Sequence, residues 1–343
     1  MIFRAAVLWG LTVITLFGRG LDDVLDRWDE RLTFSSENSQ VRARASGTLE
    51  FEGYWFPQPA PALIDAKGEA LFNPRATVFL DVQMGPRLYA FAQARVDHGF
   101  DPSQDPLRGR LDEYAIRVGV FDRGDVNIQV GKFATVVGNW VGRHGAWDNP
   151  LITAPLAYEN LSGVWDQAAA RSVNTLLAWS HVKPRAVPGV PAADKYLRLP
   201  IVWGPSYATG FAVTGKIGRA TYAAEVKNAS LSSRPSEWSA NDRRWDHPTV
   251  SGRIGFLPNQ AWNLGVSVSS GSYLLEQARP TLAPGYRLGD YRQTVIAQDL
   301  SFAWHHWQVW GEVFEARFEI PRVGYADTVA YYVETKYKIT PQL

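Results

Sequence analysis

The sequence predicts an all-β chain that crosses a membrane as an antiparallel β-barrel. Three observations lead to this prediction. Apolar and polar residues alternate with period two through most of the chain after residue 40. Short turns alternate with long connections between these segments, as they do in outer-membrane barrels. Beyond residue 20 no stretch approaches the roughly 20 apolar residues that a spanning helix requires, so strands must cross the bilayer.

The composition narrows the classes of function. The 35 Lys and Arg residues nearly balance the 34 Asp and Glu residues, so no basic excess indicates a nucleic-acid partner. The chain has no cysteine, which excludes thiolate metal sites and thiol catalysis and suits passage through an oxidising compartment. A barrel of this size usually forms one unit, so the 343 residues are expected to hold a single domain.

Residues 1–20 are predicted to be a signal peptide with an approximate cleavage point. Arg4 supplies a positive charge ahead of an apolar run at 5–17, which is too short to span a bilayer. We therefore expect export. The next segment, 21–40, is predicted to begin with a short amphipathic helix at about 21–32, because its apolar residues recur at helical spacing. These residues are Leu21, Val24, Leu25, Trp28 and Leu32.

About twelve strands are predicted in the barrel region, 41–343. The segment 41–56 shows the pattern most clearly, because Ala, Gly, Leu and Phe occupy one face while Arg, Ser and Glu occupy the other. Most segments have nearly the 9–11 residues that a tilted membrane strand needs. The predicted strands are 41–56, 74–84, 87–97, 111–121, 125–132, 206–217, 219–230, 247–257, 260–271, 290–304, 306–318 and 327–340.

The connections alternate in length, which assigns tight turns to the periplasmic side and long loops to the extracellular side. Tight turns are predicted at 85–86, 122–124, 217–218, 258–259 and 305, and long connections at 57–73, 98–110, 231–246, 272–289 and 319–326. The connection 133–205 is longer than loops in compact domains usually are, which marks a functional segment. We expect it to fold into the barrel.

The directions of the flanking strands require an even number of membrane strands within 133–205, and zero is the simplest number. The run 172–181, which resembles a strand, then belongs to this loop as a small hairpin. The last strand, 327–340, runs into what resembles the start of a turn. We therefore expect a chain truncated at its C-terminus, with about 16 strands in the complete barrel.

Charged side chains on the polar face are expected to face a water-filled lumen, because ions at this density are too costly to bury dry. The predicted lumen-facing residues are Arg42, Arg44, Glu50, Glu52, Asp81, Arg95, Asp97, Glu113, Arg117, Glu225, Lys227, Arg253, Asp299, Glu312, Glu334 and Lys336. Tyr and Trp near strand ends match the aromatic girdles of membrane barrels.

The long loop combines charged groups with flat rings, which together can form a constriction that orients solutes. The candidate constriction residues are Arg143, His144, Trp147, Asp148, Glu159, Trp165 and Asp166. A loop fastened to the barrel wall by its own hydrogen bonds explains any single one of them equally well. The loop has six Lys or Arg against four Asp or Glu, which predicts a slight anion preference.

The segment Asn127-Ile-Gln-Val-Gly-Lys-Phe-Ala-Thr-Val-Val-Gly138 resembles the strand-to-loop region of phosphate-selective and related bacterial porins. The resemblance implies a loop that folds back to narrow the pore, here 133–205, and a homotrimer. Phosphate-selective members line their channels with an excess of Arg and Lys. The predicted lumen face is about balanced in charge, so phosphate selectivity does not carry over.

These observations favour a porin in the outer membrane of a Gram-negative bacterium, a passive channel for small hydrophilic solutes or ions. Its expected partners are the lipid bilayer and those solutes. The six His residues are scattered and no catalytic motif is present, so no catalytic residue, metal or cofactor is expected. The alternatives are a non-conducting structural or adhesive barrel and an outer-membrane hydrolase. Conductance in a planar bilayer separates the channel from both.

Overall fold

The computed structural model describes residues 31–55, 70–99, 106–121, 124–145, 148–149, 151, 154–180, 197–235 and 245–339. Within them the chain forms one antiparallel sheet of thirteen strands, each paired with its neighbour in sequence. The strands are β1 (Thr33–Ser35), β2 (Val41–Trp55), β3 (Ala70–Met84), β4 (Leu88–Asp97), β5 (Arg108–Gly119), β6 (Asn127–Phe133), β7 (Ala208–Ile217), β8 (Ala220–Lys227), β9 (Thr249–Phe256), β10 (Trp262–Ser272), β11 (Arg292–Trp304), β12 (Trp307–Ile320) and β13 (Gly324–Tyr337).

All twelve predicted strands are present, and the short strand β1 is added before them. The strand β6 pairs directly with β7, from Asn127 opposite Thr214 to Phe133 opposite Ala208. This confirms that no membrane strand lies between β6 and β7 in the sheet. The predicted signal peptide and most of the predicted helix at 21–32 lie outside the described residues.

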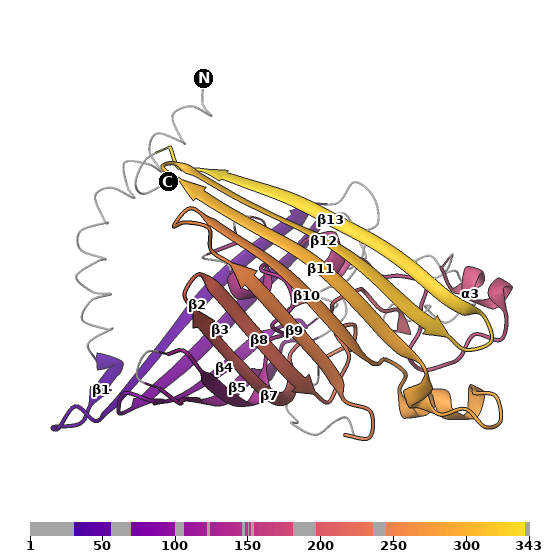
Figure 1. Cartoon of the computed structure of the whole chain (residues 1–343), viewed down its shortest axis with the longest axis horizontal. Coiled ribbons are helices and arrows are strands. Elements are labelled where there is room, and N and C mark those ends of the chain that lie inside the picture. Colours follow the sequence, from indigo (N-terminus) through magenta and orange to yellow (C-terminus); the bar gives the residue numbers. More distant parts are fainter. Residues whose placement is uncertain are drawn as a thin grey trace.

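The sheet is strongly rolled. In Figure 1 the indigo and purple strands β2–β5 lie behind the orange and yellow strands β8–β13, and magenta segments of the long connection lie between them. The end strands β1 and β13 do not pair with each other within the described part of the chain. None of the helices in that part is long and apolar enough to cross a membrane.

The run 172–181 is not a hairpin, and its described part forms the helix α3 (Val173–Ser180). Ser172 caps this helix, because its hydroxyl accepts the backbone N–H of Thr175 at 3.3 Å. Leu176 and Trp179 lie three residues apart, on one side of the helix, and both pack against a buried apolar cluster. Helix capping and this packing therefore override the strand-like sequence.

The predicted long connection at 319–326 is a tight turn at 321–323. The strands β12 and β13 stay paired from Trp307 opposite Tyr337 up to Ile320 opposite Gly324. Arg322 and Gly324 have φ angles of 64° and 112°, which reverse the chain within three residues. The expectation was wrong because the alternation of short and long connections does not extend to this hairpin.

The remaining helices are short and lie in the connections. They are the 3-10 helices η1 (Val141–Arg143), η3 (Glu276–Thr281) and η4 (Leu288–Asp290) and the α-helix α2 (Leu156–Glu159). Two buried apolar clusters include residues of these connections. One joins Val137, Trp140 and Tyr158 of the long connection to Phe314 of β12. The core therefore lies on one side of the sheet, between the strands and the long connection.

We call the side of the sheet that contacts the segment 134–207 the inner face, and the opposite side the outer face. Side chains alternate between faces along a strand, and directly opposed residues share a face. Glu312, which contacts the segment, lies opposite Asp299, and Asp299 lies opposite Gly265. Followed from strand to strand, the registers place all sixteen predicted lumen-facing residues on the inner face.

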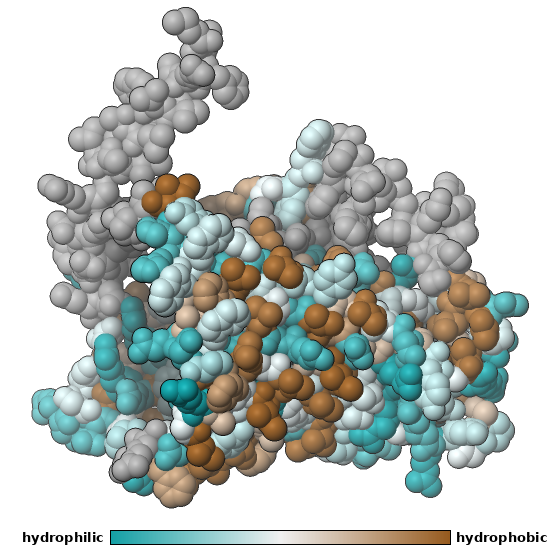
Figure 2. Space-filling model, turned by 45° about the horizontal axis from the view of Figure 1, so that its top comes forward, coloured by the Kyte–Doolittle hydropathy of each residue, from teal (hydrophilic) through white to brown (hydrophobic). Residues whose placement is uncertain are grey.

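The outer face exposes apolar side chains while the inner face buries charged ones. Ile254 of β9 is 71% exposed and Val333 of β13 is 76% exposed, whereas the inner carboxylate Glu312 is 2% exposed. Figure 2 shows hydrophobic side chains gathered across the middle of one side of the molecule. Soluble proteins rarely expose an apolar surface of this extent. The distribution is that of a sheet whose outer face meets lipid.

Candidate functional site

The long connection crosses the inner face as an inner loop, which we define as residues 134–207. Four wall carboxylates, the anchoring glutamates, accept hydrogen bonds from its first ten residues. Glu113 of β5 accepts the backbone N–H of Ala134 at 2.7 Å, and Glu225 of β8 accepts that of Val136 at 3.2 Å. Glu312 of β12 and Glu334 of β13 complete the set, as described below. The loop thus passes from β6 to the far end of the sheet.

Glu312 receives more hydrogen bonds from the inner loop than any other anchoring glutamate. It accepts the backbone N–H of Asn139, the backbone N–H of Trp140 at 3.1 Å and the hydroxyl of Tyr158 at 2.8 Å. These bonds replace the water that the carboxylate loses when it is buried. One side chain therefore fixes both the outgoing and the returning part of the loop.

Gly138 is required where the loop passes over Glu312. Its φ is 78°, in the region that favours glycine. A Cβ at this position would stand 2.5 Å from the hydroxyl of Tyr158 and 2.6 Å from Oε1 of Glu312. The close approach of backbone and carboxylate depends on the missing side chain.

Arg143 is held against the wall. Its guanidinium donates to both oxygens of Glu334, at 3.0 and 2.6 Å, and stacks over the ring of Trp310 with a 4.2 Å separation. Burial alone would lower the pKa of Arg143, but the hydrogen bonds to Glu334 and Tyr332 raise it. The residue is 9% exposed, and its charge is matched locally by the carboxylate of Glu334.

Lys227 holds the base of the loop. Its ammonium donates to the carbonyl of Phe133 at 2.7 Å, where the loop begins, and to that of Ser206 at 3.4 Å, where it ends. The same group lies 3.4 Å from the carboxylate of Glu225, which also accepts the hydroxyl of Thr135 at 2.5 Å. This buried pair of charges is therefore bonded to both ends of the loop.

His144 is neutral. Its Nδ1 lies 2.6 Å from the carbonyl of Val141, which can only accept, so Nδ1 carries the proton and Nε2 accepts the hydroxyl of Tyr207 at 2.7 Å. Burial lowers the pKa of His144 to about 4. Burial also raises the pKa of Tyr158 and that of Tyr207 well above the ordinary value. The loop beside the wall is thus a low-dielectric surface.

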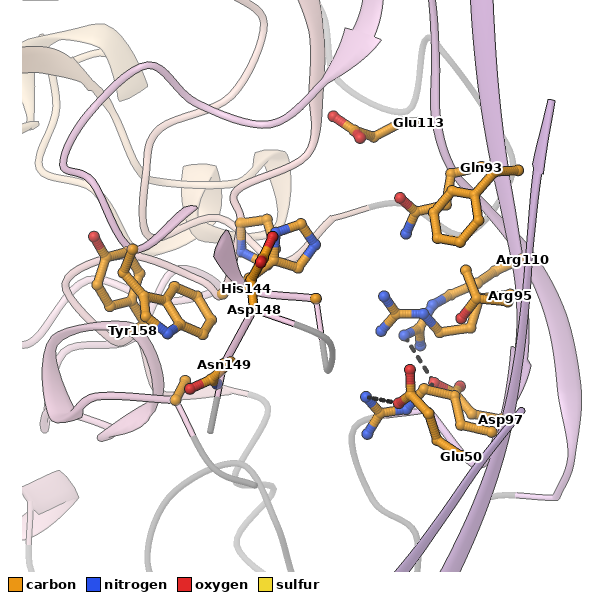
Figure 3. Close-up of a pocket in the computed structure, with 18 of the residues that line it drawn as sticks. Glu50, Gln93, Arg95, Asp97, Arg110, Glu113, His144, Asp148, Asn149 and Tyr158 are labelled. Atoms are coloured by element: carbon orange, nitrogen blue, oxygen red, sulfur yellow. Dashed lines mark hydrogen bonds and ion pairs between the residues drawn. The ribbon is translucent and has the colours of Figure 1, made fainter. Parts of the chain in front are cut away.

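A cavity of about 400 Å³ lies between the inner loop and the strands β2–β5. In Figure 3 Arg95 and Arg110 project from the wall toward the loop, and His144, Asp148 and Asn149 lie across the open space from them. The charged lining residues are Arg75, Arg95, Arg110, Glu50, Asp81, Asp97, Glu113, Asp148 and Glu159. Aromatic side chains of both wall and loop complete the lining. The wall supplies all three guanidinium groups and four of the carboxylates, and the loop supplies the other two carboxylates. Fixed charges of both signs can orient a polar solute.

The wall arginines belong to one network with neighbouring carboxylates. Arg75 pairs with Glu52 at 2.7 Å, and Arg110 pairs with Asp97 at 3.0 Å. Asp112 contacts Arg110 at 2.8 Å and also lies 3.2 Å from Arg95. These bonds fix the arginine side chains in place, which keeps the polar groups of the cavity preorganised.

A β-bulge in β5 brings Asp112 into this network. Gln93 lies opposite Glu113, whereas the next residue of β4, Ala94, lies opposite Leu111, so Asp112 has no partner in the register. Two successive acidic side chains therefore reach the inner face. The alternation of apolar and polar residues gives no sign of this bulge. Arg75, in contrast, lies on the polar face of a predicted strand, so the sequence could have placed it among the lumen-facing residues. Arg110 fell just before a predicted strand boundary.

A second cavity of about 400 Å³ is also lined by Glu113. Its lining includes Arg117 and Gln129 of the wall and Val136 of the loop. Arg117 donates to the amide oxygen of Gln129 at 2.9 and 2.7 Å. The two cavities share four lining residues, which are Phe91, Glu113, Gly142 and His144.

The structure separates the predicted constriction residues into groups. His144, Asp148 and Glu159 line the first cavity, while Arg143 is held against Glu334. Trp165 stacks on Trp179 at 4.3 Å, and the carbonyl of Asp166 accepts the N–H of Leu275, so both residues lie in a different part of the loop. Trp147 lies outside the described residues. Across the described chain, no group of three or more His, Asp or Glu residues is arranged to hold a metal ion.

No family model matches the chain, and a comparison with curated proteins found no match. Among solved structures it is similar to OmpF of Salmonella typhi in complex with daunomycin, at 10% identity and a TM-score of 0.47, over 89% of this chain and 82% of that chain. An anion-selective porin from Comamonas acidovorans is 11% identical with a TM-score of 0.44, over 86% and 75%. OpdK of Pseudomonas aeruginosa with vanillate is 12% identical with a TM-score of 0.38, over 86% and 63%. Likenesses this distant say nothing about solute or selectivity.

Proposed function

We propose that the chain is a porin of the bacterial outer membrane, which forms a water-filled channel for passive diffusion of small hydrophilic solutes or ions. The observation that carries this proposal is the distribution of side chains over the sheet. Exposed apolar residues cover the outer face, and bonded charges cover the inner face. A bilayer supplies the apolar surroundings that the outer face needs, and water in a lumen solvates the inner charges.

The position of the inner loop is consistent with a channel that the loop narrows but does not fill. The apolar cluster around Tyr158 and Phe314 packs the loop against the β11 and β12 side of the sheet. Cavities remain on the opposite side, between the loop and the strands β2–β7. Each has a volume that admits a solute of a few heavy atoms and its water. Solutes therefore pass beside the loop, between the charged wall and the carboxylates of the loop.

The proposal includes two further expectations. The sequence resemblance to porins supports a homotrimer, and the molar mass of the detergent-solubilised protein tests it. A passive route is also expected over a catalytic one, because the six His residues are scattered in the sequence and no catalytic motif is present.

Conductance of the purified protein in a planar bilayer tests the channel. The chain has no native cysteine, so Asp148→Cys on the cavity and Glu315→Cys on the outer face form a matched pair. A bulky water-soluble thiol reagent should reduce the conductance of the first variant and leave that of the second unchanged. Absence of conductance in the unmodified protein, or equal block in both variants, contradicts the proposal.

A further inference from the structure

We infer that the channel prefers cations, and that Glu113 sets this preference where the two cavities meet. The inference rests on the proposed channel function and adds the class of ion that the channel favours. It depends on the position of charges along the passage, whereas the slight anion preference predicted from sequence depended on their number in the loop.

The two cavities meet at the four residues that line both of them. Phe91 and Gly142 carry no charge, and His144 is neutral at physiological pH because burial lowers its pKa to about 4. Glu113 is therefore the charged member of this set. A solute that moves from one cavity to the other passes beside its carboxylate.

Glu113 is fixed in a position suited to this role. Its Oε1 accepts the N–H of Ala134 at 2.7 Å, which holds the side chain at the junction. The residue is half-buried, and Figure 3 shows its carboxylate projecting from the wall into the space beside the loop. A charge that is fixed beside a narrow route acts on every ion that passes.

The first cavity adds to the same field. Its lining holds three arginines against six carboxylates, an excess of three negative charges when all are ionised. Each of these arginines is already paired with a wall carboxylate. Asn73 lies in the same lining, is 5% exposed and has an amide oxygen without a hydrogen-bond donor. The cavity therefore offers more acceptors than donors, which favours a cation over an anion.

Among the basic residues of the loop that the structure describes, none offsets this excess. Lys183, Arg185 and Lys195 lie outside the described residues, and Arg143 is matched by Glu334. Arg171 and Arg198 are absent from the lining of the described cavities. Two of the four loop carboxylates, in contrast, line the first cavity. The positions of the described charges therefore predict a local field of the opposite sign to the one predicted from a count over the whole loop.

The expected effect of one charge follows from Coulomb attraction. In water of physiological ionic strength, a carboxylate raises the local concentration of a monovalent cation at about 6 Å by roughly 1.7-fold and lowers that of a monovalent anion by the same factor. Neutralising Glu113 should thus lower the ratio of K⁺ to Cl⁻ permeability about threefold.

The test is the reversal potential of the reconstituted protein in a KCl gradient. We expect K⁺ preference in the unmodified protein and a reduced preference in Glu113→Gln, whose amide oxygen can still accept the N–H of Ala134. Glu315→Gln, which removes the same charge from the outer face, is the matched control and should leave the potential unchanged. Asp148→Asn, which removes a cavity charge from the loop, should shift the potential in the same direction as Glu113→Gln.

The outcomes distinguish this inference from the proposed function. A conducting protein that prefers Cl⁻, or a Glu113→Gln variant with the same potential as the Glu315→Gln control, overturns the inference and leaves the channel intact. A protein that does not conduct overturns the channel itself. Equal shifts in Glu113→Gln and Glu315→Gln show a non-specific charge effect and also overturn the inference.

Discussion

Replacing Glu312 with alanine should release the inner loop from the wall without dissolving the sheet. Glu312 is 2% exposed, and its carboxylate accepts two backbone N–H groups and the hydroxyl of Tyr158. Alanine leaves these three donors without a partner. The strand itself keeps its register with β11 and β13, because those bonds use the backbone.

The magnitude follows from the three donors. A buried donor left unsatisfied costs about 1–3 kcal/mol, and three neighbours that act together cost less than three times the single value. Asp299 lies opposite Glu312, so the substitution also removes a repulsion between two carboxylates. We therefore expect a loss of about 3 kcal/mol in loop attachment, which corresponds to a roughly 100-fold larger population of detached loop.

Amide hydrogen exchange over residues 134–143, together with single-channel conductance, measures this change. In Glu312→Ala we expect faster exchange at Asn139 and Trp140 and larger, noisier conductance. Glu312→Gln should fall between this variant and the unmodified protein, since its amide oxygen still accepts. Glu315→Ala on the outer face is the control. Exchange and conductance in Glu312→Ala equal to those of the control would refute the anchoring role.

Three further predictions concern single residues of the inner loop. Arg143→Gln should leave the carboxylate of Glu334 without its cation and weaken loop attachment by about 3–5 kcal/mol. It should also shift the reversal potential toward K⁺. An unchanged reversal potential would contradict the pairing of Arg143 with Glu334. His144 is neutral in the folded loop, where its pKa is about 4, below its ordinary value. The free energy that it contributes to loop attachment is therefore full above pH 6.5 and falls by up to about 3 kcal/mol as the pH drops from 6.5 toward 4. Protease protection of the loop should follow this window in the unmodified protein, and His144→Gln should abolish the pH dependence. Gly138→Ala should loosen the loop as Glu312→Ala does, because its Cβ would meet Tyr158 and Glu312 and its φ is positive; full loop protection in this variant would be inconsistent with the close approach.

The strands could be predicted because the alternation of apolar and polar residues is imposed by lipid on one face and polar groups on the other. The segment from Val41 to Trp55 shows this alternation in both its sequence and its burial. The helix α3 could not be predicted, because its short apolar run fits either period. Ser172 as a cap and the contact of Trp179 with a buried cluster decide the outcome.

The candidate site could be predicted only in part. The faces of charged strand residues were readable from the period of two, but their partners were not, because these lie far away in sequence. Arg143 and Glu334 are separated by 191 positions, and Val136 and Glu225 by 89. The sequence also cannot show that four wall glutamates hold the loop, since this depends on the path of the loop across the sheet.

The central claim, that one face of the sheet meets lipid and the other meets water, is tested most directly by single-cysteine labelling along β4. The protein without cysteine supplies a clean background. In the reconstituted protein, variants at Tyr89, Phe91 and Gln93 should react with a small water-soluble thiol reagent, and variants at Leu88, Ala90 and Ala92 should be protected. Uniform reactivity along these six positions would contradict the account.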